Sequence, residues 1–283
     1  MKKVILTGID FSECSINALE HAISIANKAD ADVCMVWVNR PVSGKEIYLV
    51  SQDQIVAEAI TRFEVMIDKY QPLMGKGKLF FKVRKGKIYR EIVDLADELD
   101  AFLVVIGTHG ASGFEELWMG SNAFRIVSAI QRPIVSIRAG VDIGRTIKTV
   151  VMPIDSTVES RQKTPMTALI AKYFDAEIHV LALLSSDVPE IVETVREYIK
   201  QVEVYLKENE VRYIVKELKT NNLTTDTIQY AMDVQANLIS IMDEQEIKPS
   251  NIWLGPFAQQ MVHRSPIPVM SIHAKDFTMA ASM

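Results

Sequence analysis

The stretch that decides the fold is residues 101–138, which read AFLVVIGTHGASGFEELWMGSNAFRIVSAIQRPIVSIR. It opens with an apolar run without a charge, Ala101 to Ile106, which predicts a strand buried on both faces of a parallel sheet and ending at Gly107. A helix is then predicted to end before Pro133, followed by a short strand from Ile134 to Ile137. The helix is predicted from apolar residues at helical spacing, namely Ala123, Ile126, Val127 and Ile130.

Three glycines, Gly107, Gly110 and Gly120, separate the strand from the helix, and Ser121 follows the last of them. Glycine lets backbone amides approach a ligand closely, and amides at a helix N-terminus bind anions. Ser121 could serve as the N-cap or lend its hydroxyl to a phosphate. This loop follows the carboxyl end of a parallel strand, where open α/β sheets bind ligands. The pattern therefore predicts a phosphate site, and the alternative is that the glycines only permit tight turns.

A second motif stands at the start of the chain, where Val4 to Ser15 reads VILTGIDFSECS and Asp10 ends the first strand. Together with the spacing of the three glycines and Ser121, it resembles the ATP-binding universal stress proteins. The resemblance implies the strand order 3-2-1-4-5, which brings Asp10 next to the glycine loop. It also implies that Asp10 hydrogen-bonds the ribose or a polar base edge, and that the backbone of Val38 lines the adenine pocket. The alternative for Asp10 is that it only caps the following helix.

Composition narrows the class of protein. The 283 residues suit two domains of about 140 residues each, and 48% apolar with 24% charged residues is typical of a soluble globular protein. The net charge of −5 argues against nucleic acid or an anionic membrane as the main partner. Two cysteines argue against a disulfide-stapled fold, and no apolar run approaches the roughly 20 residues of a membrane span. We therefore expect a cytoplasmic protein.

Strands alternate with helices along the first half, which predicts right-handed crossovers and an open parallel sheet with helices on both faces. The second half repeats the pattern. Val4–Asp10 aligns without a gap with Thr149–Asp155, and Trp118 and Trp253 also align. We therefore expect an α/β fold with two tandem five-stranded parallel sheets, in domains 1–143 and 144–283. The aligned tryptophans suggest a packing or interface role.

The second copy has lost most of the glycine motif. Gly255 and Asp155 survive as the counterparts of Gly120 and Asp10, and the loop gains acidic residues that would repel phosphates. The counterparts of Gly107, Gly110 and Ser121 are Met242, Gln245 and Pro256, and the added acidic residues are Asp243, Glu244 and Glu246. We therefore predict one nucleotide per chain and a structural or regulatory second domain.

No P-loop, H-E-x-x-H, C-x-x-C or G-x-S-x-G motif is present, so no catalytic residue and no protein metal ligand is assigned. The hypothesis is a regulatory or signalling module of the stress response that binds ATP or AMP, with Mg²⁺ or Mn²⁺ on the phosphates. One alternative is slow ATP hydrolysis or autophosphorylation, and another is an interaction protein whose loop stays empty. His109 could contact a phosphate, and Cys14 could have a redox role.

The last strand of each domain, Ile134–Ile137 and Ile267–Ile272, is short and apolar and must be covered at its edge. Universal stress proteins pair through their last strands. The resemblance therefore implies that the two domains pack as a pseudo-twofold pair, with a homodimer as a further possibility.

Overall fold

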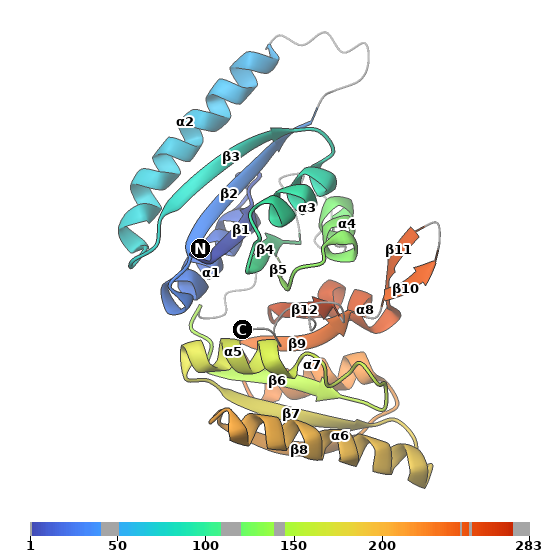
Figure 1. The fold of residues 1–283 in the computed structure, drawn as a ribbon. Helices are drawn as coiled ribbons and strands as arrows, with labels where there is room; N and C mark the ends of the chain where they lie inside the picture. The colour runs from blue at the N-terminus through green and yellow to red at the C-terminus, as the bar shows by residue number, and fades with distance from the viewer. Residues whose placement is uncertain are drawn as a thin grey trace. The chain divides into compact units, whose positions relative to one another are not determined.

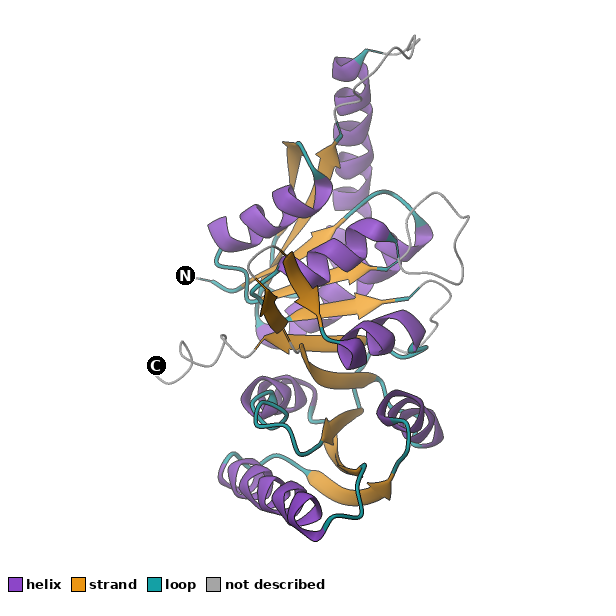
Figure 2. Cartoon of the chain, turned by 90° about the vertical axis from the view of Figure 1, so that its right-hand side faces the viewer, coloured by secondary structure: helices purple, strands orange, loops and turns teal. Residues whose placement is uncertain are grey.

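The computed structural model describes residues 2–40, 51–108, 120–138, 145–243, 245–248 and 251–273, and gives only the backbone course of 245–248 and 251–253. The chain forms two compact units, Met1–Ile130 and Gln131–Met283, with helices on both faces of the strands (Figures 1 and 2). Among the described residues, no helix is long and apolar enough to cross a membrane.

The first unit contains four parallel strands in the order β3-β2-β1-β4. This is the predicted order for these strands, and β1 lies in the interior with β2 on one side and β4 on the other. The elements are β1 (Val4–Gly8), α1 (Glu13–Ala29), β2 (Asp32–Asn39), α2 (Gln52–Tyr70), a 3₁₀ turn (Gln71–Leu73), β3 (Leu79–Lys85), α3 (Ile88–Glu98), β4 (Leu103–Gly107) and α4 (Ser121–Ala129).

Local sequence explains where these helices begin and which face they bury. The N-cap of α1 is Ser12, whose hydroxyl oxygen accepts the backbone N–H of Ser15. Helix α2 begins at a capping box formed by Ser51 and Gln54. Its buried residues are those at the predicted helical spacing, Ala59, Phe63, Met66 and Tyr70.

The second unit has the strand order β5-β12-β9-β6-β7-β8. From β8 to β12 the five strands are parallel and reproduce the order 3-2-1-4-5, so the predicted doubly wound fold is confirmed. The elements are β5 (Ile134–Ile137), β6 (Thr149–Ile154), α5 (Thr164–Phe174), β7 (Glu177–Leu184), α6 (Pro189–Glu208), β8 (Tyr213–Lys219), α7 (Leu223–Asp233), β9 (Leu238–Asp243), β10 (Gln245–Lys248), β11 (Asn251–Leu254), α8 (Pro256–Arg264) and β12 (Val269–His273).

Strand β5, the last strand of the first sequence repeat, belongs by its contacts to the second unit. It pairs antiparallel with β12, with Val135 opposite Met270, and the Ser136 hydroxyl donates to the Val269 carbonyl at 3.2 Å. This pairing covers an apolar strand that would otherwise leave an open edge. The last strands of the two repeats therefore pair as expected, whereas pseudo-twofold packing of whole domains stays a prediction. The predicted boundary at 143/144 lies outside the described residues.

Three features of the second unit differ from the sequence prediction. The hairpin of β10 and β11 follows β9 directly and was not predicted. Helix α6 buries Val195, Ile199, Val202 and Leu206, whereas Ile191, for which helical spacing with Val195 predicts burial, is 37% exposed. Helical spacing with Ile228 likewise predicts burial of Met232 in α7, but its side chain is 49% exposed. Both helices carry apolar residues on more than one face, so tertiary contacts decide which face is buried.

Candidate functional site

Three of the predicted site residues of the first unit, Asp10, Val38 and Gly107, lie at or just after the carboxyl ends of β1, β2 and β4. The chain leaves β1 toward β2 on one side, and β4 pairs with β1 on the other. The ends of β1 and β4 thus form a topological switch point, the place where open α/β sheets bind ligands. Asp10 follows β1, Gly107 ends β4, and Val38 is the penultimate residue of β2.

Asp10 forms a tight turn at the end of β1. Its Oδ1 accepts the backbone N–H of Ser12 at 3.0 Å and the Ser12 hydroxyl at 2.5 Å. The second unit contains the same turn, because Asp155 Oδ1 accepts the N–H and hydroxyl of Thr157 at 2.8 and 2.6 Å. Asp10 therefore shapes the loop before α1, and its ribose contact stays a prediction.

Phe11, next to Asp10, has a left-handed backbone with φ of 64°, which is rare for a bulky residue. Its ring packs against Phe63 with 5.2 Å between centroids, and the Arg62 guanidinium lies 5.3 Å from the Phe11 centroid. These contacts with α2 hold the strained backbone in place. The sequence contained no signal for this conformation, because the partners are far away in the chain.

Gly107 has a packing role that its motif did not predict. A Cβ at this position would lie 2.7 Å from Cys14 Sγ and 3.0 Å from the backbone carbonyl carbon and oxygen of Cys14. The end of β4 therefore touches the first turn of α1, and the glycine permits this close approach. Amide contact between Gly107 and a phosphate stays a prediction.

The glycine loop closes at its base. The Gly120 N–H donates to the Thr108 carbonyl at 2.8 Å, and Thr108 itself is buried. Gly110 and His109 lie outside the described residues, as does Trp118. Among the described residues, a Cβ on Gly120 would meet only the Thr108 carbonyl oxygen, at 3.4 Å, and its φ of −58° suits any residue. The structure itself therefore does not require a glycine at position 120.

Helix α4 begins at this closed loop, and its N-cap is Gly120 rather than Ser121, which corrects one of the two roles predicted for the serine. Ser121 is the first helical residue and is exposed. Among the described residues, no side chain caps this end, so its backbone N–H groups and the helix dipole favour an anion. A contact of the Ser121 hydroxyl with a phosphate stays a prediction.

Val38 is 8% exposed and pairs with Arg84 of β3. The strand ends one residue later at Asn39, whose side-chain amide donates to Gln52 Oε1 at 3.0 Å and whose carbonyl accepts the Gly86 N–H at 3.1 Å. The side chain of Val38 thus belongs to the core. Only its backbone is placed to face a base, and that contact stays a prediction.

The corresponding edge of the second unit is built differently. Helix α8 has Pro256 where α4 has Ser121, so its first residue carries no N–H. Met242 is buried, and Asp243 points inward, with its Oδ2 3.1 Å from His273 Nδ1. Asp243 therefore lies inside the unit rather than on the loop surface, and its repulsion of a phosphate stays a prediction. The side chains of 244–248 lie outside the described residues.

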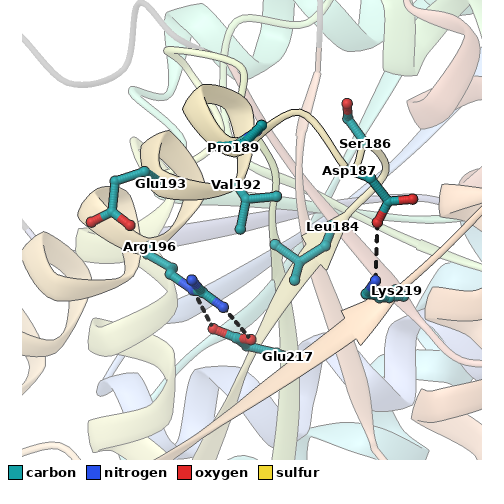
Figure 3. A pocket seen from close by; sticks show the side chains of 9 residues that line it. All are labelled: Leu184, Ser186, Asp187, Pro189, Val192, Glu193, Arg196, Glu217 and Lys219. Carbon is teal, nitrogen blue, oxygen red and sulfur yellow. Dashed lines mark hydrogen bonds and ion pairs between the residues drawn. The ribbon is translucent and has the colours of Figure 1, made fainter.

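A pocket of about 620 Å³ lies in the second unit, beside the carboxyl ends of β7 and β8 (Figure 3). Its two cations are paired with carboxylates, Arg196 with Glu217 at 3.0 and 3.3 Å and Lys219 with Asp187 at 2.9 Å. These pairs leave little positive charge to attract an anion. The predicted site residues are not among its lining residues, which are Leu184, Ser186, Asp187, Pro189, Val192, Glu193, Arg196, Glu217 and Lys219.

Comparisons with known proteins agree with this architecture. The structure is similar to that of a universal stress protein from Archaeoglobus fulgidus, with a TM-score of 0.77, 15% identity and coverage of 96% of this chain and 98% of the other. It is also similar to a functionally unknown protein from Pseudomonas aeruginosa PAO1, with a TM-score of 0.67, 12% identity and coverage of 99% and 95%. At these identities the likeness shows the fold alone.

Sequence comparison gives two matches to the universal stress proteins. Universal stress protein MJ0531 of Methanocaldococcus jannaschii is 28% identical over 144 residues, which are 48% of this chain and 82% of that protein. The model of the universal stress protein family matches residues 1–138, the stretch that contains both the Asp10 turn and the α4 N-terminus. Residues 1–138 of the chain therefore match the universal stress protein family.

Proposed function

We propose that the first unit binds an adenine nucleotide, ATP or AMP, and acts as a regulatory or signalling module in the stress response. The observation that carries this proposal is the start of α4. Within the described part of the chain no side chain caps its first N–H groups, and the Gly120 N–H donates to the Thr108 carbonyl just after β4. Such an end binds phosphate through backbone N–H groups and the helix dipole.

The rest of the nucleotide would extend along the ends of the neighbouring strands. In this arrangement the Asp10 turn would meet the ribose, and the backbone at Val38 would meet the adenine, as the family resemblance implies. A divalent ion, Mg²⁺ or Mn²⁺, would be held by the phosphates and would neutralise part of their charge. The phosphate-binding backbone would come from Gly107, Gly110 and Gly120, with the Ser121 hydroxyl as an added donor.

The second unit suggests how to test the site without unfolding it. Ser121→Pro copies the start of α8, where Gly255 precedes Pro256 with φ of −58° and ψ of 153°. Gly120 already has nearly the same conformation, with φ of −58° and ψ of 142°, so a following proline fits. Proline is also favoured at the first helical position. The variant should therefore fold normally while losing one backbone N–H and the Ser121 hydroxyl.

Losing a hydrogen bond to a charged phosphate costs about 1.5–3 kcal/mol, so Ser121→Pro should bind ATP about ten- to a hundredfold more weakly. The measurement is calorimetric titration with ATP and Mg²⁺, with circular dichroism to check folding. Pro256→Ser is the matched control and should leave ATP affinity unchanged. An undiminished affinity in folded Ser121→Pro would refute the assignment of the phosphates to α4. Phosphate release in the same samples would separate a binding module from a slow ATPase.

A further inference from the structure

Three polar side chains form a row of contacts between β7 and α7 in the second unit. The Tyr230 hydroxyl of α7 lies 3.0 Å from Nδ1 of His179 in β7, and the other ring nitrogen, Nε2, lies 3.3 Å from Glu177 Oε2. His179 is 8% exposed, Tyr230 is half-buried, and the Glu177 side chain is 41% exposed. This row of side chains therefore leads from the partly exposed carboxylate of Glu177 to the phenol of Tyr230.

The chemistry of the partners determines where the protons lie. A carboxylate can only accept, so in the neutral imidazole the proton belongs on Nε2, which faces Glu177. Nδ1 then has a lone pair and accepts the O–H of Tyr230. Burial, together with the charge of Glu177, raises the pKa of Tyr230, so the phenol keeps its proton and is the donor.

We propose that Tyr230 is a base-activated nucleophile and a covalent modification site, with His179 as its general base and Glu177 as the positioning residue. This is the acid–base–nucleophile arrangement by which a weak hydroxyl nucleophile is activated. The reactant would be an electrophile with an anionic leaving group, the chemistry shared by activated acyl and sulfonyl compounds. This inference is independent of the nucleotide proposal.

In the reaction with an aryl sulfonyl fluoride, Tyr230 Oη bonds to sulfur while its proton moves to His179 Nδ1. The sulfur–fluorine bond breaks, fluoride leaves, and the imidazolium later releases the proton to water. No oxidant or reductant is needed. The product is an aryl sulfonate ester of Tyr230 that mass spectrometry can locate.

The full-length protein offers an internal control in Tyr213, which is also half-buried but whose hydroxyl donates to Glu203 Oε1 at 3.2 Å. With benzenesulfonyl fluoride, Tyr230 should be labelled at least tenfold faster than Tyr213, because general-base assistance typically contributes a hundredfold or more. His179→Gln should reduce labelling of Tyr230 to the rate of Tyr213. Tyr230→Phe should remove the label.

The role of Glu177 is tested by comparing Glu177→Gln with Glu177→Asp, the variant that keeps a carboxylate. Glu177→Gln should slow the labelling of Tyr230, because an amide can also donate and so no longer fixes the ring proton on Nε2, whereas Glu177→Asp should restore most of the rate. Circular dichroism of each variant checks folding. Equal labelling of Tyr230 and Tyr213, or an unchanged rate in folded His179→Gln, would overturn the proposal.

Discussion

Replacing Gly107 with alanine should destabilise the first unit through a clash with α1. The new Cβ would lie 2.7 Å from Cys14 Sγ and 3.0 Å from its carbonyl carbon and oxygen. Real Cβ atoms do not approach other heavy atoms to 2.7 Å, so β4 or the first turn of α1 must move. Two of the three contacts are with backbone, which cannot turn away as a side chain can.

The magnitude follows from two opposing effects. Inserting a methyl group into a packed core typically costs about 1–3 kcal/mol. Alanine also restricts the unfolded chain and so stabilises the protein by about 0.4–1 kcal/mol. The free energy of unfolding of the first unit should therefore fall by about 1–2 kcal/mol. Hydrogen exchange followed by mass spectrometry measures this change in peptides from β4 and α1 of the intact chain.

Two further variants distinguish the clash from a general cost of losing glycine. Gly120→Ala should leave the free energy of unfolding within about 0.5 kcal/mol of the wild type, because the nearest described atom to its Cβ is a carbonyl oxygen at 3.4 Å. Adding Cys14→Ala to Gly107→Ala should restore part of the loss, since it removes the sulfur but not the backbone contacts. If Gly107→Ala is as stable as the wild type, or if Gly120→Ala loses as much, the packing explanation is wrong.

Three other predictions concern separate parts of the chain. Calorimetric titration with ATP should give one nucleotide per chain, because Pro256 removes the first N–H of α8; a stoichiometry near two would contradict this. Burial lowers the pKa of His273 from 6.5 to about 4. This contribution to stability should be complete above pH 6.5 and should be lost as the pH falls toward 4, because the unfolded ring gains its proton first. Denaturant titrations of the wild type and His273→Gln check this, and equal losses in both would refute it. Burial raises the pKa of the Cys34 thiol to about 12. At about pH 8, near the pKa of a free thiol, iodoacetamide should therefore label Cys34 only after the protein unfolds. Rapid labelling of the native protein would count against this.

The periodicity of the sequence by itself determined most of the secondary structure of the first unit. The buried residues of α2 from Ala59 to Tyr70 recur at helical spacing in the sequence, because a helix that packs on a sheet buries one stripe of its surface. The end of β4 at Gly107 followed from a single feature, the change from an apolar run to glycine. Both signals are local, so they do not depend on distant partners.

Family resemblance added the strand order, which local patterns do not specify. It implied that the ends of β1 and β4 lie beside each other, and the pairing of Leu6 with Val104 confirms this placement. The chemical roles of Asp10 and Val38 came from the same source. The structure shows their positions and their contacts within the protein.

Only the tertiary structure decided which residues meet across the chain. The close approach of Gly107 to Cys14, the strained backbone of Phe11 against α2 and the pairing of β5 with β12 each join segments far apart in sequence. The inward turn of Asp243 toward His273 is of the same kind. A sequence pattern reports the polarity of a side chain, whereas its partner depends on which strands become neighbours and in what register, and that is decided when the whole sheet packs.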